Sequence, residues 1–191
     1  MSESSREDLA VGMTLTGALE DRSTWSATGW CPVEKAVEII GSRPAMLIMR
    51  EAFYGTTRFD DFVERVGVAP ATAASHLRTL VAAGLLERHV YQEPGARRRE
   101  EYRLTDAGTD LLPVVLGLFQ WGRKHTSTNP PISFTHTGCD EPVGVAVQCD
   151  AGHRVGLAEI TATTVLPSVR EPVPPPEHSA PAPRPRPASA G

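Results

Sequence analysis

The hydrophobic period of the sequence changes at Gly84, and this change constrains the fold more than any other feature. Before Gly84, apolar residues recur at spacings of three and four, which is the pattern of helices that bury one face. After Gly84, apolar and polar residues alternate up to a Pro-Gly-Ala turn at 94–96, and a second strand-like run ends at Leu104. The sequence therefore predicts a set of helices followed by a β-hairpin.

Five helices are expected around this change of period, and prolines, hydroxyl caps and glycines mark their ends. They cover residues 32–40, 43–54, 59–66, 70–83 and 106–125. Three short helices, a longer helix and a hairpin, in this order, are typical of a winged helix-turn-helix. The predicted fold class is therefore mostly α with a β-hairpin wing, with a small β-rich module after the last helix.

Helix 70–83 has two chemically different faces. The inward face is apolar and carries Ala69, Ala73, Leu77 and Leu80. The outward face carries hydrogen-bonding side chains, namely Thr72, Ser75, His76, Arg78 and Thr79. Such groups can reach base edges and phosphates, so we predict that this helix enters the major groove of DNA. For any one of these residues, a solvated helix face is the alternative.

The expected hairpin carries a second basic feature, a run of three arginines at Arg97, Arg98 and Arg99. Three guanidinium groups at a hairpin tip suit contact with the minor groove or the phosphate backbone. Glu100 and Glu101 follow directly and moderate the field, so a solvated charge run is the alternative. Segment 30–125 holds 13 Lys and Arg against 12 Asp and Glu, a net charge of +1, so DNA contact would depend on local patches.

Several motifs in one order carry a family resemblance. They are CPVEKA at 31–36, REAFYG at 50–55, RFDDF at 58–62, LRTLVAAGL at 77–85 and EYRLT at 101–105. Together they resemble the HxlR family of bacterial regulators, within the wider MarR-like group, over about 31–125. The resemblance implies a homodimer that binds a palindromic operator. Ala71 and Ala74 depart from the family pattern, because relatives often carry longer polar side chains there.

The last helix, 106–125, carries more apolar side chains than one solvated helix explains. They are Leu111, Leu112, Val114, Val115, Leu116, Leu118, Phe119 and Trp121. A second copy of the chain that covers part of this surface is the simplest explanation, and a two-fold dimer would present two recognition helices to DNA. Burial under the C-terminal segment of the same chain is the alternative.

Cys31 stands directly before the first helix, where a helix N-terminus can raise the reactivity of a thiol. The family resemblance adds that some relatives use a cysteine at this place to sense oxidants or electrophiles. Cys31 is therefore a candidate redox sensor. A quiet buried cysteine is the alternative.

Residues 126–166 are predicted to form the small β-rich module, with short strands at 132–135, 143–148 and 154–157. The ends of these strands carry His136, Cys139, Cys149 and His153. Two cysteines and two histidines can form a tetrahedral Zn²⁺ site, so zinc is a candidate cofactor. Cysteines that merely lie near one another, as an inherited remnant of a family site, are the alternative.

The remaining segments restrict the class of protein. Residues 1–29 are expected to form a partly helical arm, and the Pro- and Ala-rich tail, 167–191, to be disordered. Few cysteines, the absence of a signal-peptide pattern and the absence of an apolar run near the ~20 residues that span a bilayer predict a cytoplasmic protein with no membrane partner.

The sequence shows no glycine-rich phosphate loop, no paired acid and base and no nucleophile beside a base, so an enzyme is not expected. The leading hypothesis is a transcriptional regulator in which domain 30–125 binds double-stranded DNA and dimerises. Its signal would be an oxidant or a small molecule. The alternative is a winged-helix protein-interaction module that no longer binds DNA, which the near-neutral charge and the two alanines of helix 70–83 favour.

Overall fold

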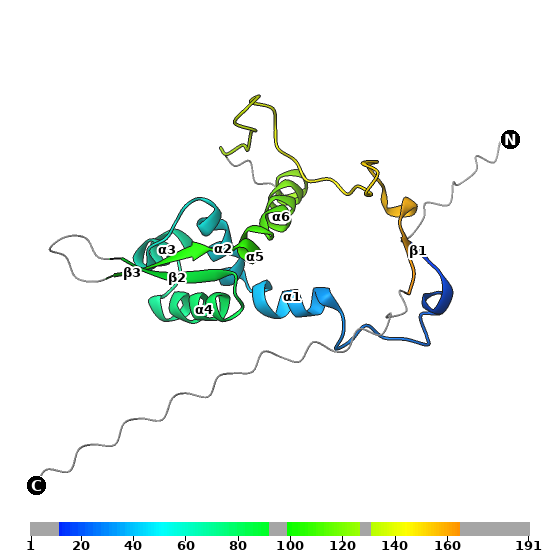
Figure 1. Cartoon of the computed structure of the whole chain (residues 1–191), viewed down its shortest axis with the longest axis horizontal. Coiled ribbons are helices and arrows are strands. Elements are labelled where there is room, and N and C mark those ends of the chain that lie inside the picture. The colour runs from blue at the N-terminus through cyan, green and yellow to red at the C-terminus, as the bar shows by residue number, and fades with distance from the viewer. Residues whose placement is uncertain (1–11, 92–98, 127–130, 165–191) are drawn as a thin grey trace, which may run out of the picture. The chain divides into compact units, whose positions relative to one another are not determined.

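The computed structural model describes residues 12–91, 99–126 and 131–164 (Figure 1). The chain divides into one unit of residues 24–156 and a second unit formed by the segments that flank it. The predicted tail, 167–191, lies outside the described residues. Among the helices that are described, none is long and apolar enough to cross a membrane.

The flanking unit contains one short parallel sheet. Strand β1 (Thr14–Leu15) pairs with β4 (Thr161–Ala162), and the short 3-10 helices η1 (Gly17–Leu19) and η2 (Leu157–Glu159) accompany them. Of the described part of the expected N-terminal arm, only η1 is helical.

The first four helices lie close to their predicted positions. They are α1 (Pro32–Ile40), α2 (Arg43–Phe53), α3 (Phe59–Val66) and α4 (Pro70–Ala82). Ser42 caps α2, because its Oγ accepts the backbone N–H of Ala45 at 3.2 Å. Gly67 ends α3 at φ 67°, a left-handed conformation that glycine adopts without a steric cost. Local caps therefore set both ends of the segment that turns into α4.

The predicted hairpin is present and is fixed to the helices. Strands β2 (Leu86–Tyr91) and β3 (Arg99–Leu104) pair antiparallel, with Leu86 opposite Leu104. The loop before α3 is hydrogen-bonded to the hairpin, because the N–H of Tyr102 in β3 donates to the carbonyl of Thr57 at 2.8 Å. Figure 1 shows the hairpin projecting from the helices, with α4 against β2 and α3 against β3. These features confirm the winged helix-turn-helix.

The prediction of one long final helix is wrong. The chain forms α5 (Asp106–Thr109) and then α6 (Leu112–His125). Pro113 explains the break, because it has no N–H to donate to the carbonyl of Thr109 and its ring would clash with that carbonyl in a continuous helix. Thr105 caps α5 as predicted, and its Oγ1 accepts the N–H of Gly108 at 3.0 Å.

One apolar core joins α2, α3, α4 and the hairpin. Its largest fully buried side chains are Phe62, Ile48, Met49, Leu77, Leu80 and Leu86. Of the predicted inward face of α4, Ala73, Leu77 and Leu80 are buried, whereas Ala69 is exposed because it caps the helix instead of lying within it.

The segment after α6 pairs with itself only through isolated bridges. Thr135 pairs with Pro142 and Gln148 with Arg154, so the strands expected at 132–135, 143–148 and 154–157 do not form. Most side chains of this segment are exposed, so it has no apolar face that would hold a sheet together. Phe134 is one of the partly buried exceptions, and it packs edge-on against Phe119 of α6 with ring centroids 4.8 Å apart.

Candidate nucleic-acid interface

The helix-turn-helix fixes which face of α4 meets solvent. Ala73, Leu77 and Leu80 have no exposed surface, so they hold the helix against the core. The opposite face carries the five predicted contact residues. Ser75, Arg78 and Thr79 are exposed, and Thr72 and His76 are half-buried. The structure therefore places the predicted set on one accessible face.

Two of these side chains already have intramolecular partners. The hydroxyl of Thr79 donates to the carbonyl of Ser75 at 3.2 Å, which leaves its oxygen lone pairs able to accept from a ligand. His76 Nδ1 lies 3.4 Å from Ser42 Oγ, so the capping residue of α2 touches the outer side of α4. Arg78 forms no ion pair with any residue that the structure describes, and its guanidinium is available to phosphate or guanine.

Arg43 is a basic residue at this face that the sequence did not single out. It begins α2, directly after Ser42, and is exposed. The contact between Ser42 and His76 brings the start of α2 to α4, where the helix dipole favours an anion. The signal was present in the sequence as an arginine at a capped helix start, but the contact that brings this start to α4 joins Ser42 and His76 across 34 positions of the chain.

One of the three predicted arginines of the hairpin lies among the described residues. Arg99 begins β3 and is exposed, whereas Arg97 and Arg98 lie outside the described residues. Two other arginines of the hairpin are paired. Arg88 lies 3.9 Å from Glu100, and Arg103 donates to Glu101 at 2.7 Å. Arg99 has no such partner within the described range, so its guanidinium can face phosphate.

Cys31 and the proposed zinc ligands do not gather into one site. Cys31 precedes α1 as its N-terminal cap residue and is a half-buried free thiol. His136 Nδ1 lies 3.2 Å from Cys139 Sγ, and the Cys149 N–H donates to the His153 carbonyl at 3.0 Å. Within the described ranges, no group of three or more His, Cys, Asp and Glu residues could hold a metal ion. Zinc stays a prediction.

Large apolar side chains are exposed on α6, and also on α1 and at the residue shortly before it. We call these two sets together the α1–α6 surface, and their members are Trp30, Val33, Val37, Leu112, Val114, Leu118 and Trp121. Helix α6 has 14 residues and none of them is buried. Phe134 contacts Phe119 of α6 and Val145 contacts Gln120 of α6, and these contacts cover only part of the helix. Among the described residues, burial under the same chain therefore accounts for part of its apolar content and leaves the rest exposed.

A helix-turn-helix and a hairpin anchored to the same core define a winged helix-turn-helix protein. The chain belongs to the HxlR-like helix-turn-helix family, whose model matches residues 39–130. This finding confirms the family that the sequence motifs predict.

Relatives and solved structures agree with this assignment. The uncharacterized HTH-type transcriptional regulator Rv3095 of Mycobacterium tuberculosis is 38% identical over 137 residues, which span 71% of this chain and 83% of that protein. The regulator YdeP of Bacillus subtilis, also described as HTH-type, is 31% identical over 96 residues, 50% of this chain and 73% of its own.

Among solved structures, that of PA1607, a candidate transcription factor, superposes with a TM-score of 0.61 at 31% identity and covers 68% of this chain and 92% of that one. The structure of PA1374 from Pseudomonas aeruginosa, described in the same way, has a TM-score of 0.52 at 30% identity. It covers 74% of this chain and 96% of its own. The match therefore extends beyond the hairpin and includes most of each neighbour.

Proposed function

We propose that the protein is a transcriptional regulator that binds a specific DNA sequence as a homodimer on a palindromic operator. One observation carries this proposal. Helix α4 is held by three fully buried residues, while its other face presents exposed and half-buried hydrogen-bonding side chains. The relatives described above are named transcriptional regulators, which supports the same function.

The DNA contacts divide between base edges and phosphates. Ser75, Arg78 and Thr79 are exposed on α4 and would enter the major groove, with Thr72 and His76 at the edges of this surface. Arg43 at the start of α2 and Arg99 on the wing would neutralise flanking phosphates. Phosphate contacts fix orientation and base contacts select the sequence, so Arg78 is the side chain expected to affect specificity most.

The homodimer would form through the α1–α6 surface. Large apolar side chains that are exposed together mark a protein interface, and a two-fold interface uses the same patch on both copies. A dimer of this kind presents two α4 helices to successive major grooves, which explains why the operator would be palindromic.

Regulation would come from an oxidant at Cys31 or from a small molecule. Cys31 is a free, half-buried thiol at the start of α1, next to the α1–α6 surface, so its oxidation would alter the dimer. A zinc ion at the His136 and Cys139 pair would require the Cys149 turn to close onto it. No catalytic activity is part of the proposal.

The test is DNA binding, measured by fluorescence anisotropy on the region upstream of the protein's own gene, at low and moderate salt. We expect tighter binding to that DNA than to unrelated DNA. Arg78→Ala should weaken specific binding by about 1–3 kcal/mol. Arg154→Ala, an exposed arginine on the segment after α6, should leave the affinity unchanged.

The alternative, a winged-helix interaction module, predicts a different result. Such a protein would show no preference for any DNA at either salt concentration, and Arg78→Ala would have no effect. That outcome, obtained with folded protein and with a library of random duplexes, would overturn the proposal.

A further inference from the structure

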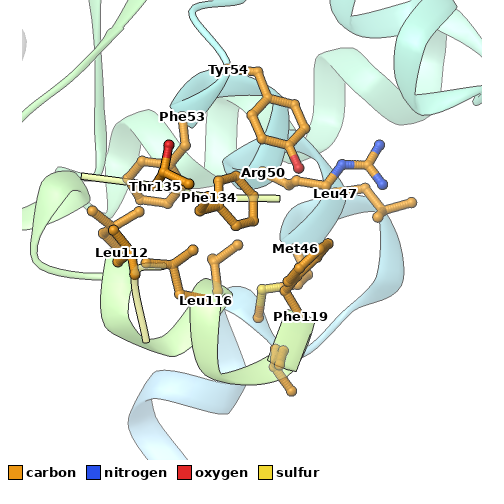
Figure 2. Close-up of a pocket in the computed structure, with 13 residues that line it drawn as sticks. Met46, Leu47, Arg50, Phe53, Tyr54, Leu112, Leu116, Phe119, Phe134 and Thr135 are labelled. Atoms are coloured by element: carbon orange, nitrogen blue, oxygen red, sulfur yellow. The ribbon is translucent and has the colours of Figure 1, made fainter. Parts of the chain in front are cut away.

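A cavity of about 450 Å³ lies between α2, α6 and the segment that follows α6 (Figure 2). Its walls include Met46, Phe53, Tyr54, Val115, Phe119 and Phe134. None of these six side chains belongs to the fully buried core that anchors α4. The volume falls in the range of about 300–1,000 Å³ that is typical of small-molecule sites.

The wall formed by the segment after α6 is fixed in place. Phe134 packs edge-on against Phe119 and stacks on Tyr54, with ring centroids 4.8 and 6.3 Å apart. Gln120 of α6 accepts the N–H of Val145 at 3.0 Å and donates to the carbonyl of Val143 at 3.4 Å. A polar clamp and two ring contacts therefore hold this wall against α6 while the cavity beside it stays open.

The charges around the cavity favour an uncharged occupant. Arg50 is the single charged residue in the lining, and its Nη2 lies 2.7 Å from Oε1 of the buried Glu51. The pair is internally balanced, so a buried anion would lose its hydration without gaining an unpaired cation.

Two hydroxyl groups supply the polar contacts. Tyr54 and Thr135 line the cavity, and neither hydroxyl is hydrogen-bonded to another residue of the described ranges. Figure 2 shows the Tyr54 hydroxyl directed from α2 toward the other lining side chains. Aromatic walls with a few polar groups bind flat apolar molecules and orient them by one hydrogen bond.

We propose that this cavity is an effector site for a small uncharged aromatic compound that carries a hydroxyl or carbonyl group. The regulatory meaning of the site rests on the function proposed above. Helix α2 touches α4 through Ser42 and His76, and α6 carries part of the α1–α6 surface. An occupant between α2 and α6 would alter how the DNA-reading helix is held relative to the dimer.

Two probes with one aromatic skeleton test the site directly. N-phenyl-1-naphthylamine is uncharged, and 8-anilinonaphthalene-1-sulfonate adds a sulfonate to it. The uncharged probe should gain fluorescence and saturate at one molecule per chain, and the sulfonate should bind at least about tenfold more weakly. Equal affinity for the two probes would overturn the proposed ligand class.

Substitutions at two positions of α6 locate the bound probe. Val115 lines the cavity, whereas Lys124 is exposed and belongs neither to the cavity lining nor to the α1–α6 surface. Val115→Trp should fill the space and abolish binding, and Lys124→Trp should retain it. If Val115→Trp fails to fold by circular dichroism, the smaller pair Val115→Phe and Lys124→Phe repeats the comparison. Binding that survives in a folded Val115 variant would overturn the site.

Displacement of the bound probe by other compounds tests the role of the Tyr54 hydroxyl. Tyr54→Phe should weaken 1-naphthol by about two- to tenfold, the range of one hydrogen bond, and leave naphthalene unchanged. An equal effect on both compounds would contradict the polar contact. Because no probe measurement involves DNA, probe binding by a protein that binds no DNA would retain the site and reject only its regulatory meaning.

Discussion

Helices α4 and α6 are similar in length, with 13 and 14 residues, but their burial is opposite. Helix α4 buries Ala73, Leu77 and Leu80 completely, whereas α6 has no buried residue and exposes large apolar side chains such as Leu118 and Trp121, by 51% and 61%. The difference teaches that one chain is sufficient to position α4. Helix α6 exposes apolar surface that the described residues of the chain leave uncovered.

The two helices therefore have separate roles in the proposed regulator. A rigidly held α4 suits DNA recognition, because its contact residues keep a fixed orientation relative to the hairpin. An incompletely buried α6 suits assembly and effector binding, because Leu112 and Leu118 belong both to the cavity lining and to the α1–α6 surface.

The largest expected effect concerns the buried face of α4. Leu77→Ala removes a side chain with no exposed surface and leaves a cavity in the core. It should lower the free energy of unfolding by about 2–5 kcal/mol, as measured by urea denaturation.

Leu118→Ala on α6 is the matched control for Leu77→Ala. It should destabilise the protein only at concentrations at which the dimer forms, because Leu118 is half exposed in the single chain. Equal losses for the two variants at high dilution would remove the contrast between the helices.

The next effect concerns the α1–α6 surface. Leu118→Glu places a charge in the proposed interface, where it would be desolvated without a partner. The variant should be a folded monomer by light scattering at a concentration at which the natural chain is a dimer. Ala107→Glu, an exposed position on α5, should remain dimeric. If the natural chain is itself monomeric, the prediction that a second copy of the chain covers α6 is wrong.

The smallest expected effect concerns Ser42, which caps α2 and contacts His76 of α4. Ser42→Ala removes the cap of α2 and the contact with His76, and should cost about 1 kcal/mol of unfolding free energy. Ser42→Asp supplies another good cap and should restore most of this stability. Failure of the aspartate to restore it would show that the His76 contact matters more than the cap.

The sequence was sufficient to predict the elements whose ends are encoded locally. Pro32 begins α1 and Gly67 ends α3 at the expected positions, because a fixed φ and a left-handed φ each restrict one residue strongly. The buried face of α4 was predicted from the helical spacing of Leu77 and Leu80. These features depend on near neighbours in the chain.

Features that depend on distant contacts were harder to predict. The break before Pro113 is an exception, because its cause is local: the apolar pattern continues across it, but a proline inside a helix interrupts the hydrogen bonds of the helix. The strands expected after α6 do not form because alternation without a buried face is insufficient. The cavity joins Tyr54 to Phe134 across 80 positions, and no local pattern indicates that pairing.

A hydroxyl-radical footprint of the protein on the DNA upstream of its own gene tests the central claim most directly. We expect two protected patches related by a two-fold axis, about 10 base pairs apart, one for each α4 of the dimer. Arg78→Ala should remove both patches together. A single patch, or protection that ignores the DNA sequence, would contradict a homodimer that recognises a palindrome through α4.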